Sequence, residues 1–182
     1  MNWLRDMEYC PRCGCRTFDV AGVKNRRCRH CGFELFMNAS ASTAAVIING
    51  RDELLVVRRA KEPARGTYDL PGGFADAGET AEEGVAREVM EETGLTVVSA
   101  EYLFSEPNTY EYGGLLIPTQ DLFFRCSVAD ATAPHAHDDA AECLWIPLNR
   151  VRPEDFGLAS ISRGIGRLMK IVAAHDATTR YN

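Results

Sequence analysis

The chain has 182 residues, 46% of them hydrophobic, which is enough to bury one good core and a small appended unit. A net charge of −6 and a pI near 5.3 argue against a protein that binds polyanions over its whole surface. Because the N-terminus lacks an apolar signal segment and no apolar run reaches transmembrane length, we expect a cytoplasmic protein without a membrane partner.

Two copies of a short cysteine motif occupy the N-terminal region. Cys10 with Cys13, and Cys28 with Cys31, each form the pattern C-x2-C-G, and fourteen residues separate the two pairs. Four thiolates at this spacing favour tetrahedral Zn²⁺, so residues 1–36 are predicted to form a small N-terminal zinc ribbon. Unrelated thiol pairs or disulfides are the alternative, and the surplus Cys15 could compete with Cys13.

The predicted ribbon is basic although the chain is acidic. Residues 10–31 carry a local net charge of +5. The segment has no recognition helix, and its aromatic residues do not alternate with its basic ones, so nucleic acid is not the expected partner. A small solvated domain that senses a phosphate ligand is the preferred interpretation.

A second domain is expected over residues 41–182, after a polar link at 38–42. Residues 43–48 form a β-rich run, and Asn49-Gly50 predicts a hairpin turn into a strand at 54–58. Arg58 and Arg59 end this strand and are candidate ligands for substrate phosphate, although solvated charge is the alternative. Residues 60–79 form a loop long enough to be functional.

A helix is predicted to begin near Ala81. Thr80 and Glu83 form a capping box, and Gly94 is a natural C-terminal stop. Arg87 can pair with either Glu83 or Glu91. Gly84 is unfavourable in a helix, and close approach of a neighbouring strand would explain it.

Three acids fall on one face of this helix, namely Glu88, Glu91 and Glu92. Crowded carboxylates repel one another unless a cation lies between them, and hard oxygen ligands suit Mg²⁺ or Mn²⁺. Such a metal neutralises a diphosphate and activates water. The helix therefore predicts hydrolysis at phosphorus.

The remaining elements complete an α/β pattern. Residues 97–104, 122–128 and 144–148 read as strands, and 161–174 as an amphipathic helix. A Gly- and Pro-containing stretch joins the first two strands, residues 153–158 are expected to be irregular, and the loop at 129–141 is expected to be mobile. Cys126 and Cys143 are interpreted as buried core thiols.

The stretch from Gly73 to Leu95, GFADAGETAEEGVAREVMEETGL, resembles the Nudix box of hydrolases that split a nucleoside diphosphate linked to another group. The resemblance implies an α/β/α sandwich with a mixed sheet. It implies that Glu88, Glu91 and Glu92 bind the metals, and that Arg87 and Glu79 orient them. Family members often place a base or extra ligand in a later loop, where Asp138, Asp139 and Glu142 are candidates; solvated loop acids are the alternative.

A zinc ribbon before such a domain is similar to the NADH pyrophosphatase group, whose fingerprint after the box is SQPWPFPxS. Ser105 and Pro107 match it here, whereas its tryptophan and second proline are missing. Tyr110 and Tyr112 could stack on a base, or be ordinary strand tyrosines. The expected substrate is NAD(H), ADP-ribose or a related dinucleotide or ADP-sugar.

Two other functions are weighed against this one. They are removal of modified nucleoside triphosphates and a non-catalytic ligand sensor whose ribbon binds a partner protein. The ribbon itself is expected to be structural, packing on the Nudix core or across a homodimer.

Overall fold

The computed structural model describes residues 3–131, 134–136 and 140–179. The chain divides into two compact units, residues 1–40 with 109–119, and residues 41–108 with 120–182. In the part of the chain that is described, no helix combines the length and apolar character needed to cross a membrane.

The N-terminal unit contains a small antiparallel sheet. A 3-10 helix at Trp3–Asp6 precedes β1 (Phe18–Val20), β2 (Asn25–Cys28) and β3 (Glu34–Phe36), which pair in the order β1-β2-β3. Its core is small and includes Leu4, Phe18 and two of the cysteines. Buried Arg26 donates hydrogen bonds to the carbonyl groups of Phe18 (2.8 Å from Nε) and Leu4 (3.1 Å from Nη1). One residue of the basic segment is therefore structural.

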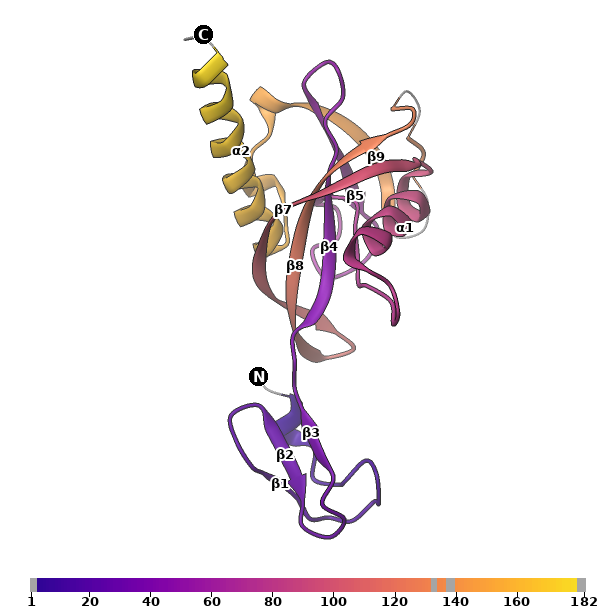
Figure 1. The fold of residues 1–182 in the computed structure, drawn as a ribbon, viewed down its shortest axis with the longest axis vertical. Helices are drawn as coiled ribbons and strands as arrows, with labels where there is room; N and C mark the ends of the chain where they lie inside the picture. The colour runs from indigo at the N-terminus through magenta and orange to yellow at the C-terminus, as the bar shows by residue number, and fades with distance from the viewer. Residues whose placement is uncertain (1–2, 132–133, 137–139, 180–182) are drawn as a thin grey trace. The chain divides into compact units, whose positions relative to one another are not determined.

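The second unit is built on two three-stranded sheets (Figure 1). β4 (Ser40–Val46), β8 (Leu115–Val128) and β7 (Val97–Tyr112) form one, in the order β4-β8-β7. β6 (Tyr68–Asp69), β5 (Glu53–Arg59) and β9 (Ala140–Pro147) form the other, in the order β6-β5-β9. β5 runs antiparallel to both of its neighbours, whereas β4 and β8 run in the same direction, so the strands combine both orientations.

Two helices cover opposite faces of the first sheet. The adjacent residues Phe123 and Phe124 of β8 point to opposite sides, as successive strand residues do. Phe124 packs in a cluster with Val85 and Val89 of α1 (Ala81–Thr93), and Phe123 packs in a cluster with Leu168 of α2 (Ala159–Thr179). Figure 1 shows α1 and α2 flanking the strands. The predicted α/β/α sandwich with a mixed sheet is confirmed.

Several predicted boundaries were wrong. The stretch expected to join two strands is itself β-structure, so β7 and β8 form one long hairpin that turns at Gly113 and Gly114, both with positive φ. The expected loop at 60–79 contains β6, and the expected loop at 129–141 ends in β9. Short 3-10 helices lie at Leu148–Arg150 and Pro153–Asp155. Pattern-based boundaries stop at proline and glycine, whereas strand pairing continues through them.

The turn at Asn49-Gly50 was predicted correctly, but its consequence differs from a simple hairpin. Ile48 forms an antiparallel bridge with Leu54 on the far side of the turn. The two flanking strands, β4 and β5, nevertheless belong to different sheets. The turn therefore transfers the chain from one sheet to the other.

Candidate functional site

Helix α1, which carries the predicted metal ligands, begins and ends as predicted. The Thr80 Oγ1 accepts a hydrogen bond from the Glu83 amide at 3.1 Å, and the Thr80 amide donates to Glu83 Oε2 at 2.8 Å. Gly94 closes the helix with φ of 70°, and its N–H donates to the Met90 carbonyl. Glu83 closes the N-terminus of the helix. Of the two pairings expected for Arg87, the structure therefore contains the one with Glu91.

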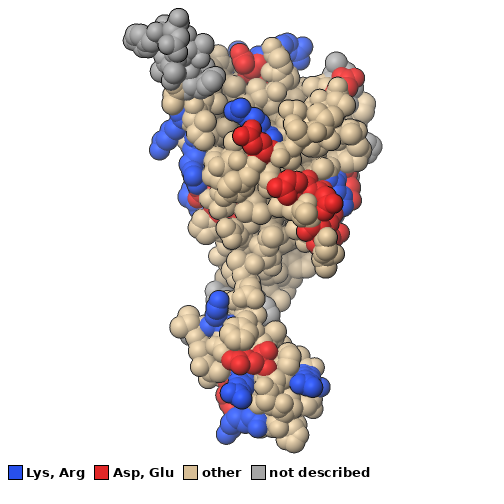
Figure 2. Space-filling view, viewed as in Figure 1, with Lys and Arg blue, Asp and Glu red and all other residues tan. Residues whose placement is uncertain are grey.

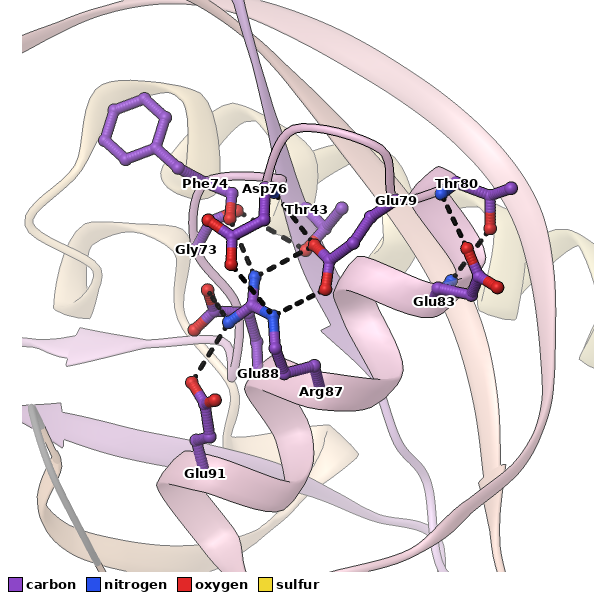
Figure 3. A network of polar contacts seen from close by, with 10 residues as sticks. All are labelled: Thr43, Gly73, Phe74, Asp76, Glu79, Thr80, Glu83, Arg87, Glu88 and Glu91. Carbon is purple, nitrogen blue, oxygen red and sulfur yellow. Dashed lines mark hydrogen bonds and ion pairs between the residues drawn. The ribbon is translucent and has the colours of Figure 1, made fainter.

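Arg87 is the centre of the polar network in Figure 3. Its Nε donates to Glu79 Oε1 at 2.7 Å, and its Nη1 lies 2.9 Å from Glu88 Oε1 and 3.0 Å from Glu91 Oε2. The Nη2 donates to the Phe74 carbonyl at 3.0 Å. One guanidinium thus joins three carboxylates of the helix and its preceding loop to the backbone of that loop.

Glu88 lies against a glycine that leaves room for it. A Cβ on Gly73 would lie 2.6 Å from the Glu88 Cδ, so a side chain at this position would displace the Glu88 carboxylate. Burial raises the pKa of Glu88 above its ordinary value, and the hydrogen bond from Arg87 opposes this rise. The hydrogen bond from Arg87 likewise lowers the pKa of Glu79. The loop and helix therefore hold a carboxylate in a partly desolvated recess.

Glu92 approaches the same loop from further along the helix. It is buried, and its Oε2 accepts a hydrogen bond from the Gly72 amide at 3.1 Å. The three predicted metal ligands are thus all anchored, Glu88 and Glu91 by Arg87 and Glu92 by the loop.

The reason for Gly84 differs from the one expected. A Cβ at this buried position would meet the Glu79 carboxylate at 3.3 Å and Ala75 at 3.7 Å. The close neighbour is therefore the loop before the helix rather than a strand. Gly84 lets that loop approach, which in turn allows Glu79 to reach Arg87.

The acids fit a hard divalent cation by their chemistry. Glu79, Glu88 and Glu91 contact Arg87, and Glu92 contacts the loop before the helix. Carboxylate oxygens are the preferred ligands of Mg²⁺ and Mn²⁺. Their roles as metal ligands stay predictions.

The four ribbon cysteines fit Zn²⁺ by geometry. Their sulfur atoms all lie within 4.8 Å of one another, and two of the Sγ–Sγ distances, Cys10–Cys31 and Cys13–Cys28, are 3.7 Å. A tetrahedral ion 2.3 Å from each sulfur places neighbouring sulfurs roughly 3.8 Å apart. The Thr17 hydroxyl, 3.3 Å from Cys28 Sγ, lowers the pKa of that thiol to about 6, whereas desolvation and the neighbouring thiols raise the pKa of Cys13. All the described cysteines are free, so the disulfide alternative is wrong.

The predicted phosphate ligands on β5 are engaged with protein groups. Arg58 donates to Glu142 Oε2 at 3.0 Å and to the Gly66 carbonyl at 2.9 Å. Arg59 forms an ion pair of 2.5 Å with the nearly buried Asp69. Among the candidate bases, Glu142 is therefore paired with Arg58, while Asp138 and Asp139 lie outside the described residues. Substrate-binding and base roles for these residues stay predictions.

The other predicted substrate contacts lie along β7 rather than in a loop. The Ser105 hydroxyl accepts a hydrogen bond from Gln120 Nε2 of β8 at 3.4 Å. Tyr110 and Tyr112 lie further along the strand, and Tyr112 is exposed. Substrate-binding roles for these three residues stay predictions.

Two loop residues of the site, Asp76 and Phe74, were not predicted from the sequence. The Asp76 carboxylate lies 3.9 Å from Arg87 Nε, and its amide donates to Glu79 Oε2 at 2.8 Å. The carbonyl of Phe74 holds Arg87, and its ring is partly exposed. Asp76 could have been predicted, because it is an acid close to Glu79 within the box. The contact of Phe74 could not, because any residue has a backbone carbonyl.

The α/β/α sandwich therefore gathers four glutamates on one helix and the glycine-containing loop before it. The NUDIX domain family matches residues 39–165. The chain therefore belongs to the Nudix family.

Relatives and solved structures agree with this assignment. The chain is 34% identical over 152 residues to a protein of Pseudomonas syringae pv. tomato named NAD-capped RNA hydrolase NudC, covering 84% of this chain and 52% of that protein. A Haemophilus influenzae protein of the same name is 32% identical over 107 residues, covering 58% and 40%. The chain thus spans about half the length of these curated relatives or less.

The fold is also found in experimental structures. A NUDIX hydrolase from Nitrosomonas europaea superposes with a TM-score of 0.69 at 23% identity, covering 90% of this chain and 91% of that one. The NUDIX domain of Shewanella oneidensis NrtR, solved in complex with ADP ribose, gives a TM-score of 0.60 at 22% identity over 75% and 90% of the two chains. At this identity the similarity concerns the fold.

Proposed function

We propose that this protein is a divalent-metal-dependent pyrophosphohydrolase that cleaves a nucleoside diphosphate linked to another group. The observation that carries the proposal is the network around Arg87, which holds Glu79, Glu88 and Glu91, together with Glu92 anchored on the Gly72 amide of the same loop. In the reaction, water attacks one phosphorus, the bond to the bridging oxygen breaks, and two phosphate monoesters leave.

Each residue of the network has a defined part in this proposal. Glu88, Glu91 and Glu92 would hold Mg²⁺ or Mn²⁺, which on binding supplies charge neutralisation and a more acidic water. Arg87 orients Glu88 and Glu91 through one nitrogen, and Glu79 orients Arg87. Gly73 keeps the recess beside Glu88 open.

NAD(H) and ADP-ribose are the first substrates to test, because the similar proteins carry a name that specifies NAD-capped RNA. The ribbon, with boundaries 1–36 ahead of a domain at 41–182, is proposed to hold one structural Zn²⁺ through its four cysteines. A role in a homodimer and a cytoplasmic location remain part of the proposal.

The decisive experiment is a hydrolysis screen with product identification. Purified protein with Mg²⁺ or Mn²⁺ is incubated with NADH, NAD, ADP-ribose, an RNA carrying a 5′ NAD and an oxidised deoxynucleoside triphosphate. Nucleoside monophosphate from the first four supports the proposal; pyrophosphate from the last alone indicates a triphosphate-cleaning enzyme. Tight binding without any turnover indicates a sensor.

Glu92→Gln tests the metal assignment within the same screen. Glu92 is buried against the Gly72 amide, and the amide side chain keeps its size while removing the charge. Turnover should fall by about a hundredfold or more while the melting temperature stays near that of the native protein. A fully active variant would overturn the assignment.

A further inference from the structure

A compact ionic cluster joins α2 to the edge strand β7. Glu106 is nearly buried, with 12% of its side chain exposed. Its Oε2 lies 3.1 Å from Arg163 Nε, and its Oε1 lies 2.8 Å from Arg167 Nη1. Arg163 and Arg167 are one helical turn apart on α2, so each carboxylate oxygen has its own guanidinium.

The same two arginines also hold the backbone of β7. Arg167 Nη1 donates to the Ser105 carbonyl at 3.1 Å, and Arg163 Nη2 donates to the Pro107 carbonyl. The Arg167 guanidinium stacks over the Phe104 ring, 4.2 Å from its centroid. Carbonyls of alternate residues on an edge strand point away from the sheet, where no further strand satisfies them. The arginines supply those missing donors.

Glu106 and Ser105 point to opposite faces of the sheet. Glu106 faces α2, where the arginines lie. Ser105 instead forms a hydrogen bond with Gln120 of β8. The next residue of β8, Asp121, points to the opposite face from Gln120 and accepts a hydrogen bond from Ser160 of α2 at 2.5 Å. The side chains of Ser105 and Gln120 therefore lie on the face that carries α1 and its carboxylates.

We propose that Glu106, with Arg163 and Arg167, is a positioning device that fixes Ser105 on the α1 face of β7 for substrate binding. The inference rests on the proposed function and deepens it, because it makes α2 part of the specificity apparatus. The fingerprint compared with this stretch has glutamine at the position of Glu106, and only a carboxylate offers two equivalent acceptors to two arginines. The clamp therefore depends on a carboxylate at position 106.

The first test uses Glu106→Gln, which keeps the shape of the side chain and removes one acceptor. KM for the best substrate of the screen should rise roughly tenfold while kcat changes less than about twofold, because binding rather than chemistry is affected. Glu101→Gln is the matched control, since Glu101 is an exposed acid on the same strand. If both variants have the KM of the native protein, the proposal is overturned while the proposed function stands.

A double-mutant cycle separates positioning from general stability. If Glu106 acts through Ser105, Glu106→Gln should change KM by less than about twofold once Ser105 is already alanine. A purely structural clamp would instead give the full tenfold effect in the Ser105→Ala background, and that result would overturn the proposal.

Hydrogen exchange gives a measurement that does not depend on activity. In Glu106→Gln the amides of the peptide covering residues 104–108 should exchange about tenfold faster than in the native protein, whereas Glu101→Gln should leave them unchanged. Unchanged exchange in Glu106→Gln overturns the clamp even if the protein hydrolyses none of the compounds. Absence of hydrolysis with faster exchange overturns the proposed function, and with it the role in substrate binding, while the clamp on β7 stands.

Discussion

Replacement of Arg87 by methionine is the sharpest test of the network. Methionine keeps the apolar stem of the side chain but removes every donor to Glu79, Glu88, Glu91 and the Phe74 carbonyl. Breaking a buried ion pair costs about 3–5 kcal/mol. Because 26% of the Arg87 side chain is exposed and solvent screens the remaining acids, we expect a loss of about 2 kcal/mol in the free energy of unfolding.

The measurement is thermal unfolding without divalent metal. A loss of this size should lower the melting temperature by about 4–8 °C for a domain of this length. Arg51→Met is the control, because Arg51 is 76% exposed and forms only a local pair with Glu53. If both variants melt together at neutral pH, the argument that Arg87 holds the acids in place is refuted.

The pH dependence of this difference has a definite sign. The hydrogen bond from Arg87 lowers the pKa of Glu79 in the folded protein. The resulting stabilisation is present above the unfolded pKa of about 4.3 and is lost as pH falls through the lowered folded value. The gap in melting temperature between native protein and Arg87→Met should therefore be widest near pH 7 and narrow below about pH 4.

Three further substitutions have matched controls. Gly73→Ala places a Cβ 2.6 Å from Glu88 Cδ and should weaken Mg²⁺ binding about tenfold in calorimetry, whereas Gly50→Ala meets nothing within 4 Å and should leave it unchanged; equal affinities would contradict the recess. The native protein should contain about one zinc ion per chain by plasma mass spectrometry. Cys28→Ser should lose this ion, whereas Cys15→Ser should retain it. Loss of zinc from both variants would argue against a four-cysteine site. On α2, Gly164→Ala puts a Cβ 2.2 Å from Phe123 Cζ and should cost about 1–3 kcal/mol in denaturant unfolding, whereas Gly166→Ala should stabilise by up to about 1 kcal/mol; effects of the same sign would contradict the packing.

Local chemistry explains what could be predicted. The capping box at Thr80, the stop at Gly94 and the paired cysteines depend on residues a few positions apart, so spacing alone predicts them. The fold class was predicted from the order of strands and helices together with the Nudix box, and the family match supports that box. The position of the three glutamates on α1 followed from helical periodicity.

What the sequence by itself determined was therefore the fold class, the family and the set of acids and thiols. Only the tertiary structure decided how those groups are partnered. In the folded chain Arg58 pairs with Glu142, and Arg59 pairs with Asp69. β7 continues through Pro107, and Glu106 lies between two arginines about sixty residues away in the sequence. Such pairings depend on side chains that meet only when distant segments pack, and no local spacing encodes the distance between them.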